Sequence, residues 1–265
     1  MGTGGASLSP SKRPFRIVAH RGAPTTDAPE NTRAAFQRAI EIGADAVELD
    51  VRLTRDHVPV VYHYFYLDEV TTGSGPIFEQ TAHDLRDVRV IGSDRLGSGH
   101  EIPTLEEILE DFGRLLHLDI ELKGPEPEAA AIVGDLLVRF RSLWATIEVT
   151  SFEPSLLRDV RRTCPGIVTA LLFPRSEDWM RPDVVAYAAL QRARLAEAQV
   201  VHLHPSQLTA DVVSHVRAGA VDVHAWQVND AQALQLAADL EVPSICTDQV
   251  EQAVAFRRGY TLVAS

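Results

Sequence analysis

Short apolar runs alternate with longer amphipathic segments along almost the whole chain. Eight of the runs have the length and composition of buried strands: residues 16–20, 46–50, 117–122, 146–151, 167–173, 199–204, 221–228 and 242–247. The amphipathic segments between and after them have helical spacing: residues 32–42, 104–112, 127–143, 154–163, 184–198, 209–218, 231–240 and 250–258. Eight strand-then-helix units in 265 residues predict an α/β fold, a single (β/α)8 TIM barrel.

A ninth apolar run, residues 58–63, breaks this alternation after the second strand. It follows that strand too closely for a parallel crossover, which needs a dozen or more residues. We therefore predict a hairpin that turns near residues 55–57 and brings His63 back to the end of the barrel where Asp50 lies. Residues from about 52 to 102 are rich in turn residues and form an insertion, which we expect to cap the barrel mouth.

The rest of the chain divides into a tail and one domain. Residues 1–14 are rich in Gly, Ser and Pro and lack an apolar stretch, so we expect a flexible N-terminal tail and no secretory leader. Residues 15–265 form the single barrel domain. No stretch is apolar for long enough to cross a bilayer, and we expect no stable membrane anchor.

The net charge of −12 and the isoelectric point near 5.3 argue against a nucleic-acid partner. An acidic protein that acts on an anionic substrate needs local positive charge, so a metal ion or a few placed Arg and Lys side chains are expected. Cys164 and Cys246 are the only cysteines, and neither has a metal-binding or CxxC spacing. Two unpaired cysteines are typical of a reduced, cytoplasmic setting.

Acidic residues recur at the carboxyl ends of the predicted strands, which is the end of such a barrel that carries the chemistry. Glu48 and Asp50 are two residues apart on one strand and face the same side, and Glu121 ends the next strand of the barrel. Any one of them could pair with an arginine or cap a helix. Three carboxylates at one barrel mouth instead favour one hard divalent cation, Mg²⁺ or Ca²⁺.

His20 and His63 should reach the same mouth from two different strands, where a pair of imidazoles can act as general acid and general base. Arg21 and Lys123 lie beside these residues and can bind a phosphate group, although an ion pair with a carboxylate is the alternative. Of the other histidines, His202 is expected to point outward or into packing.

Several segments, in order, resemble the glycerophosphodiester phosphodiesterase family. They are His20-Arg21-Gly22, Pro29-Glu30-Asn31-Thr32, Gly43-Ala44-Asp45, Glu48-Leu49-Asp50-Val51, residues 59–63, Thr71-Thr72-Gly73-Ser74-Gly75, Pro103-Thr104-Leu105, Glu121-Leu122-Lys123, Ser151-Phe152, Trp226-Gln227-Val228-Asn229 and Thr247-Asp248. The resemblance extends over about residues 16–258. It implies a TIM barrel that hydrolyses glycerophosphodiesters, its small-molecule substrates, to glycerol 3-phosphate and an alcohol.

The same resemblance implies a role for each candidate residue. Metal ligands would be Glu48, Asp50 and Glu121, the acid/base pair His20 and His63, and the phosphate ligands Arg21 and Lys123. Glu30 would position Arg21 or cap the helix that starts near Asn31. Trp226 would line the substrate pocket, with core packing as the alternative. The attacking hydroxyl, of water or of the glycerol itself, stays open.

The sequence departs from the family pattern directly after the second histidine. Tyr64 stands where the family has an aspartate, and Phe65 and Tyr66 follow it. We expect His63 to be less well oriented and the rim to be more apolar. The result would be weaker activity or a preference for a bulkier alcohol.

Two other functions compete with this interpretation. One is a choline-phospholipid phosphodiesterase of the same architecture, similar to sphingomyelinase D and phospholipase D toxins, which are secreted and disulfide-stabilised, unlike a chain with two lone cysteines. The other is a phosphodiester-binding homologue that no longer turns over. The alcohol, the metal and the oligomeric state are not predicted.

Overall fold

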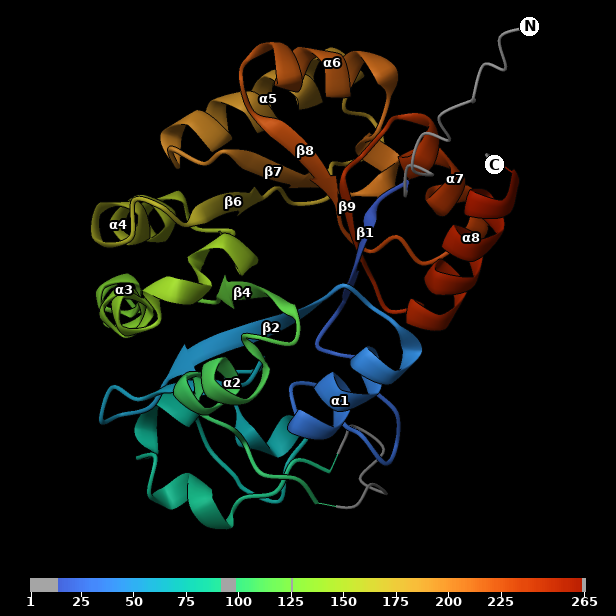
Figure 1. Ribbon diagram of the computed structural model, residues 1–265. Helices are drawn as coiled ribbons and strands as arrows, with labels where there is room; N and C mark the ends of the chain where they lie inside the picture. The colour runs from blue at the N-terminus through green and yellow to red at the C-terminus, as the bar shows by residue number, and fades with distance from the viewer. Residues whose placement is uncertain (1–13, 92–98, 125, 264–265) are drawn as a thin grey trace, which may run out of the picture.

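The computed structural model describes residues 14–91, 99–124 and 126–263. Eight parallel strands form the barrel, and helices surround it (Figure 1). The strands are β1 (Arg16–Ala19), β2 (Ala46–Leu53), β4 (His117–Leu122), β5 (Ile147–Ser151), β6 (Val168–Leu172), β7 (Val200–Leu203), β8 (Asp222–Ala225) and β9 (Ser244–Thr247). Because β1 pairs in parallel with both β2 and β9, the sheet closes on itself. The predicted TIM barrel is confirmed.

The outer helices follow the strands in the predicted order. They are α1 (Arg33–Ile42), α2 (Leu105–Phe112), α3 (Ala129–Arg139), α4 (Pro154–Thr163), α5 (Pro182–Leu195), α6 (Ala210–Ala218), α7 (Ala231–Asp239) and α8 (Val250–Val263). Thr104 starts α2 with a capping box to Glu107. The helix predicted over residues 127–143 is shorter, because it ends at Arg139 and a 3₁₀ segment, η4 (Arg141–Thr146), follows. Within the described residues, no helix is both long and apolar enough to span a membrane.

The strands have two buried faces of different character. In β2, Val47, Leu49 and Val51 face outward and join the large apolar core under the helices. Glu48 and Asp50 alternate with them and face the barrel interior. The interior therefore carries polar side chains toward the mouth. Polar groups buried in this way must be paired or must bind something.

The predicted hairpin is present after β2. Strand β3 (Pro59–Val61) pairs antiparallel with β2, with Val51 opposite Val61. The strand is shorter than predicted, but Tyr62 continues its course by donating a backbone hydrogen bond to Asp50. His57 closes the turn with a positive φ of 62°.

The insertion that follows lies to one side of the barrel, next to β2, α1 and α2 (Figure 1). It contains η1 (Leu67–Glu69), η2 (Ile77–Glu79) and η3 (Asp84–Asp87), packed on a small apolar core of its own. Of the described insertion residues after β3, His63 lines the mouth pocket. The described part of the insertion thus contributes one residue to the wall of the mouth pocket. The turn-rich residues 92–98 and the predicted tail up to residue 13 lie outside the described residues.

Candidate active site

Three carboxylates converge at the carboxyl end of the barrel. Glu48 and Asp50 come from β2, and Glu121 lies directly opposite Asp50 in the β2–β4 register. One oxygen from each lies within 4.8 Å of the others. All three residues are buried, with exposed fractions of 5%, 0% and 7%. The structure thus brings together the three predicted metal ligands.

The charges of these carboxylates are not fully compensated by the protein. Burial, reinforced by repulsion from Asp50, raises the pKa of both Glu48 and Glu121. The pKa of Asp50 is lowered: burial opposes this shift, but the cations of Lys123 and Arg21 outweigh it. Among the described residues, Glu48 Oε1 and Asp50 Oδ1 have no hydrogen-bond partner although both are buried. An oxygen-only set with unpartnered buried atoms fits a hard divalent cation.

His20 follows β1 and is held by an acid. Its Nδ1 lies 2.6 Å from Asp248 Oδ1, and its Nε2 lies 4.0 Å from Glu48 Oε2. Asn229 donates a 2.6 Å hydrogen bond to the other oxygen of Asp248. Asp248 therefore fixes the ring so that Nε2 faces the carboxylates. No role was predicted for Asp248, although its place just after β9 was a usable signal.

His63 reaches the pocket from the segment after β3. Its pKa is lowered to about 3, chiefly by burial; the charge of Asp50 opposes this shift, and the cations of Lys123 and Arg21 add to it. The imidazole is therefore neutral at physiological pH. Its Nδ1 is buried and has no hydrogen-bond partner in the described part of the chain. Both predicted histidines thus line one pocket.

Arg21 sits in a tight turn at the end of β1. Its backbone N–H donates a 2.8 Å hydrogen bond to Glu48 Oε2, and its guanidinium contacts Glu30 Oε1 at 3.0 Å and Asp50 Oδ2 at 3.3 Å. The next residue, Gly22, has a φ of +86°, and a Cβ there would lie 2.8 Å from Ala35. Only glycine fits this approach.

The structure decides between the two predicted roles of Glu30. The side chain of Thr32 caps helix α1 by accepting a hydrogen bond from Ala35, so Glu30 is not the cap. Glu30 instead contacts Arg21. Asn31 was not predicted to matter, yet it donates to Asp50 Oδ2 at 2.8 Å and accepts from the Asp50 backbone N–H at 3.1 Å. It holds a candidate ligand in place.

Lys123 lies two residues beyond Glu121 and faces the same side. Its Nζ lies 2.8 Å from Glu121 Oε1 and 3.4 Å from Asp50 Oδ1. Burial alone would lower the pKa of this amine, but these two carboxylates raise it, so Lys123 remains charged. The predicted phosphate ligands are therefore engaged with carboxylates in this structure, as the alternative interpretation expected, and they still line the pocket.

Trp226 forms part of the wall of this pocket, which has a volume of about 230 Å³. Its ring meets Phe152 edge-on, with centroids 5.7 Å apart. The indole Nε1 is buried without a hydrogen-bond partner among the described residues. Trp226 thus lines the pocket, and its N–H is available to a ligand.

Tyr64 occupies the position next to His63. Its ring meets the His63 imidazole edge-on at a centroid distance of 4.7 Å. Burial raises the pKa of its hydroxyl, which also interacts electrostatically with Glu30 and Arg21. Tyr64 therefore contacts both an imidazole and the Arg21–Glu30 pair, so the position is occupied by a group that holds the site together.

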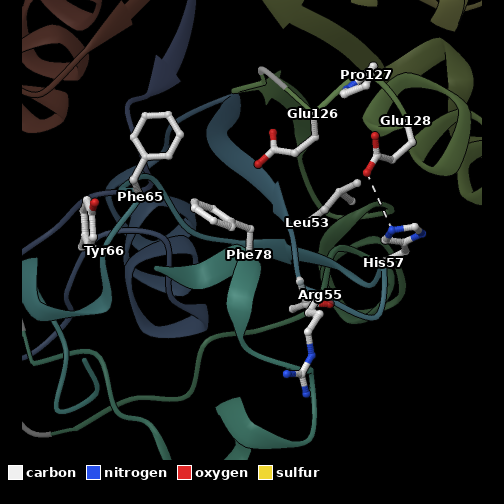
Figure 2. Close-up of a pocket in the computed structure, with 10 residues that line it drawn as sticks. Leu53, Arg55, His57, Phe65, Tyr66, Phe78, Glu126, Pro127 and Glu128 are labelled. Carbon is white, nitrogen blue, oxygen red and sulfur yellow. Dashed lines mark ion pairs between the residues drawn. The ribbon is translucent and has the colours of Figure 1, made fainter. Parts of the chain in front are cut away.

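A larger cavity of about 720 Å³ lies on the side of the insertion. Figure 2 shows the rings of Phe65 and Phe78 and the carboxylate of Glu126 around the same space. Phe65, Tyr66 and Phe78 are exposed to 44%, 54% and 43%, which is unusual for large apolar side chains.

Arg52 connects this cavity with the histidine site. Its Nε donates a 2.8 Å hydrogen bond to the carbonyl of His63, and its Nη1 donates to Gly124 at 3.0 Å. Its guanidinium stacks over the ring of Phe65 at 3.9 Å. Two segments, one after His63 and one after Lys123, therefore run from the small pocket into the walls of the large cavity.

Comparison with known proteins agrees with this geometry. The sequence profile of the "Glycerophosphoryl diester phosphodiesterase family" matches residues 20–252. The Bacillus subtilis protein YhdW is 34% identical over 239 residues, which cover 88% of this chain and 93% of YhdW. The glycerophosphodiester phosphodiesterase of Caldanaerobacter subterraneus is 29% identical over 242 residues, covering 89% and 94%.

A solved structure shows the same fold. It is an Oleispira antarctica phosphodiesterase in complex with the product sn-glycerol-3-phosphate. It superposes with a TM-score of 0.73 at 25% identity, over 92% of this chain and 96% of that one. The fold, the order of the motifs and the extent of the match lead to one assignment: the chain belongs to the glycerophosphoryl diester phosphodiesterase family.

Proposed function

We propose that the protein hydrolyses glycerophosphodiesters to glycerol 3-phosphate and an alcohol, in a reaction that depends on a divalent cation and two histidines. The observation that carries this proposal is the convergence of three buried carboxylates at the barrel mouth, two of which, Glu48 and Glu121, line one pocket with two imidazoles. The product bound to the Oleispira antarctica phosphodiesterase is the expected product here. Family membership supports the same reaction.

Arg21 and Lys123 would bind the phosphodiester oxygens. Both are cations in a pocket that also contains Glu48, Asp119 and Glu121, and an anion entering the pocket finds no other Arg or Lys among its described lining residues. The guanidinium offers two parallel donors, and the ammonium adds a point charge. Glu30 and Tyr64 hold Arg21 in position for this contact.

His63 and His20 would divide the proton transfers between them. The neutral His63 can accept a proton from the attacking hydroxyl, of water or of the glycerol 2-position. His20 has Asp248 on one nitrogen and faces Glu48 with the other, so it is placed to carry a proton to the leaving alcohol. The two imidazoles therefore lie in different electrostatic environments, and such a difference allows one to act as the acid and the other as the base.

Glu48, Asp50 and Glu121 would hold the cation, Mg²⁺ or Ca²⁺, which when bound polarises a phosphoryl oxygen and lowers the pKa of a hydroxyl. Two of their oxygens, Glu48 Oε1 and Asp50 Oδ1, accept no hydrogen bond from the described residues, and this and the mutual repulsion of the carboxylates support that assignment. Asn31 keeps Asp50 oriented from behind.

The apolar cavity favours substrates with a bulky alcohol. Its walls continue from the segments that follow His63 and Lys123, and Phe65 stands at the junction. Burying an apolar group against such rings is favourable by about 25 cal/mol per Å². We also place the protein in a reducing, cytoplasmic setting, because Cys164 and Cys246 are both buried and free.

The test is a coupled assay for glycerol 3-phosphate with several deacylated head groups, from glycerophosphoethanolamine to glycerophosphoinositol, and with sphingomyelin as the competing substrate. We expect glycerol 3-phosphate only when Mg²⁺, Ca²⁺ or Mn²⁺ is present, and none after EDTA treatment. Sphingomyelin cleavage without glycerol 3-phosphate release would favour the choline-phospholipid enzyme. No turnover with any substrate and metal would favour a binding protein.

A substitution at Tyr64 tests the rim. In Tyr64→Asp, the family's acid replaces the ring, and we expect the ratio of kcat/KM for a bulky apolar alcohol to that for ethanolamine to fall roughly 3- to 10-fold, since one aromatic contact is lost. Tyr64→Phe keeps the ring and should keep this preference, while KM rises because Arg21 loses the electrostatic interaction with the hydroxyl. Unchanged rates and preferences in Tyr64→Asp would remove the idea.

A further inference from the structure

A second group of potential metal ligands lies deeper in the barrel. Glu148 comes from β5, His202 from β7 and His224 from β8. The two histidines are direct neighbours in the β7–β8 register, so both rings point into the barrel. The three residues are buried, with exposed fractions of 6%, 2% and 7%. This group is distinct from the carboxylates at the mouth.

The ligand atoms are arranged around one point. His202 Nε2 lies 2.7 Å from Glu148 Oε1, His224 Nδ1 lies 3.3 Å from the same oxygen, and the two nitrogens are 3.3 Å apart. Four ligand atoms at about 2.0–2.1 Å from a tetrahedral Zn²⁺ are separated from each other by about 3.3–3.4 Å. Two of the three separations already have this value, and the third needs to lengthen by only about 0.6 Å.

Hydrogen bonds alone do not account for this arrangement well. If both imidazoles donate to Glu148 Oε1, their two N–H groups face each other across the nitrogen contact. If one imidazole donates to the other, Glu148 receives a single hydrogen bond. A cation can instead accept a lone pair from all three atoms at once.

A fourth group, which is acidic and has one oxygen that accepts no hydrogen bond from the described residues, lies beside the cluster. Asp119 is the register neighbour of Glu148 and is only 5% exposed. Its Oδ1 is buried and has no hydrogen-bond partner among the described residues, and its charge interacts with both Glu148 and His202. Asp119 and His202 also form part of the floor of the active-site pocket, which offers an ion a path of entry.

We propose that Glu148, His202 and His224 bind a Zn²⁺ ion, with Asp119 or a water molecule as the fourth ligand. Imidazole nitrogens select zinc-class metals, whereas the carboxylates at the mouth select Mg²⁺ or Ca²⁺. The ion would link three separate strands beneath the pocket and so stabilise the barrel. The two sites would thus hold different metals, one for stability and one for catalysis.

Cobalt substitution tests this site without using activity. Metal-free protein in excess Mg²⁺ is titrated with Co²⁺, whose visible absorption is intense in a four-coordinate site. We expect one Co²⁺ per chain, displaced by Zn²⁺. His202→Gln should lower the Zn²⁺ affinity by at least about 100-fold, the upper end of the effect of outer-shell partners. His215→Gln, an exposed histidine on α6 outside the cluster, should change nothing.

Glu121→Gln separates this site from the one at the mouth. It should lose turnover but keep the Co²⁺ absorption, so failure of the catalytic proposal does not affect this test. If His202→Gln does not fold, X-ray absorption of the wild-type Zn²⁺ form replaces it, and two imidazole ligands are expected. The proposal is overturned by a wild-type protein that shows no four-coordinate Co²⁺ absorption, or by a bound Zn²⁺ without imidazole ligands.

Discussion

Replacing either His63 or His20 by alanine is expected to lower kcat roughly 10²- to 10⁴-fold, the usual contribution of a positioned acid or base. The two variants should be similar because each removes one of the two proton transfers. The neutral His63 would accept one proton, and His20, which is paired with Asp248, would donate the other. KM should change little, since neither imidazole is the main phosphate contact.

Asp248→Asn tests the same acid/base assignment through the residue that holds His20. It keeps the shape of the side chain that holds His20 but removes its charge, so we expect an intermediate loss of kcat. The control is His215→Ala, an exposed histidine on α6. Variants of His20 and His63 that retain wild-type kcat would contradict the acid/base assignment. An equal loss in His215→Ala would point to a general effect on the fold.

Removing the divalent cation is expected to stop turnover and to destabilise the fold. A ligand at about 100 times its Kd stabilises the native state by about 2.7 kcal/mol, which for a chain of this size raises Tm by roughly 5–10 °C. The buried carboxylates explain the expected loss of stability. Without the cation, burial and repulsion disfavour the ionised Glu48.

Glu48→Gln distinguishes this explanation from a general salt effect. A folded-state pKa above the unfolded value means that the ionised carboxyl costs stability at neutral pH, and a neutral Gln removes that cost. The metal-free variant should therefore melt above the metal-free wild type, yet gain little from Mg²⁺ and lack activity. Glu110→Gln, exposed on α2, should behave as wild type. The mechanism is wrong if Glu48→Gln keeps the full Mg²⁺ response. Differential scanning calorimetry with and without EDTA measures both effects.

The parts of the site that follow from local rules could be predicted from the sequence. Glu48 and Asp50 are two residues apart, so any strand places both on one face. The short link after them allows only a hairpin, and this brings His63 back. The eight-fold alternation predicts the barrel, whose strand ends then define the mouth.

The parts that depend on contacts across the barrel were missed. Asn31 and Asp248 matter through hydrogen bonds to residues 19 and 228 positions away along the chain. The position of Asp248 after a strand could indicate that it lies near the mouth, but no pattern within one segment identifies His20 as its partner. The insertion was expected to cap the mouth, but turn residues do not reveal the direction in which a segment packs. The described residues of the insertion form a core of their own beside β2.

His202 is another residue whose environment depends on contacts across the barrel. It was predicted to point outward or into packing, but it faces the barrel interior and contacts Glu148 from a strand 54 residues away. His204, the last residue of the same predicted strand, lies two positions further on, and this spacing indicated that both histidines share one face of the strand. Only the closed barrel brings this histidine to His224 and Glu148.

The most direct measurement follows bound metal and turnover in the same samples. The enzyme is first freed of all metal and then supplied with Zn²⁺, which fills the proposed deeper site. It is titrated with Mn²⁺ while electron paramagnetic resonance counts the bound Mn²⁺ ions. Glycerol 3-phosphate release is recorded at each point. We predict that turnover rises in proportion to one bound Mn²⁺ per chain, and that both are lost in Glu121→Gln. Full turnover without bound Mn²⁺, or wild-type turnover in Glu121→Gln, would contradict the account.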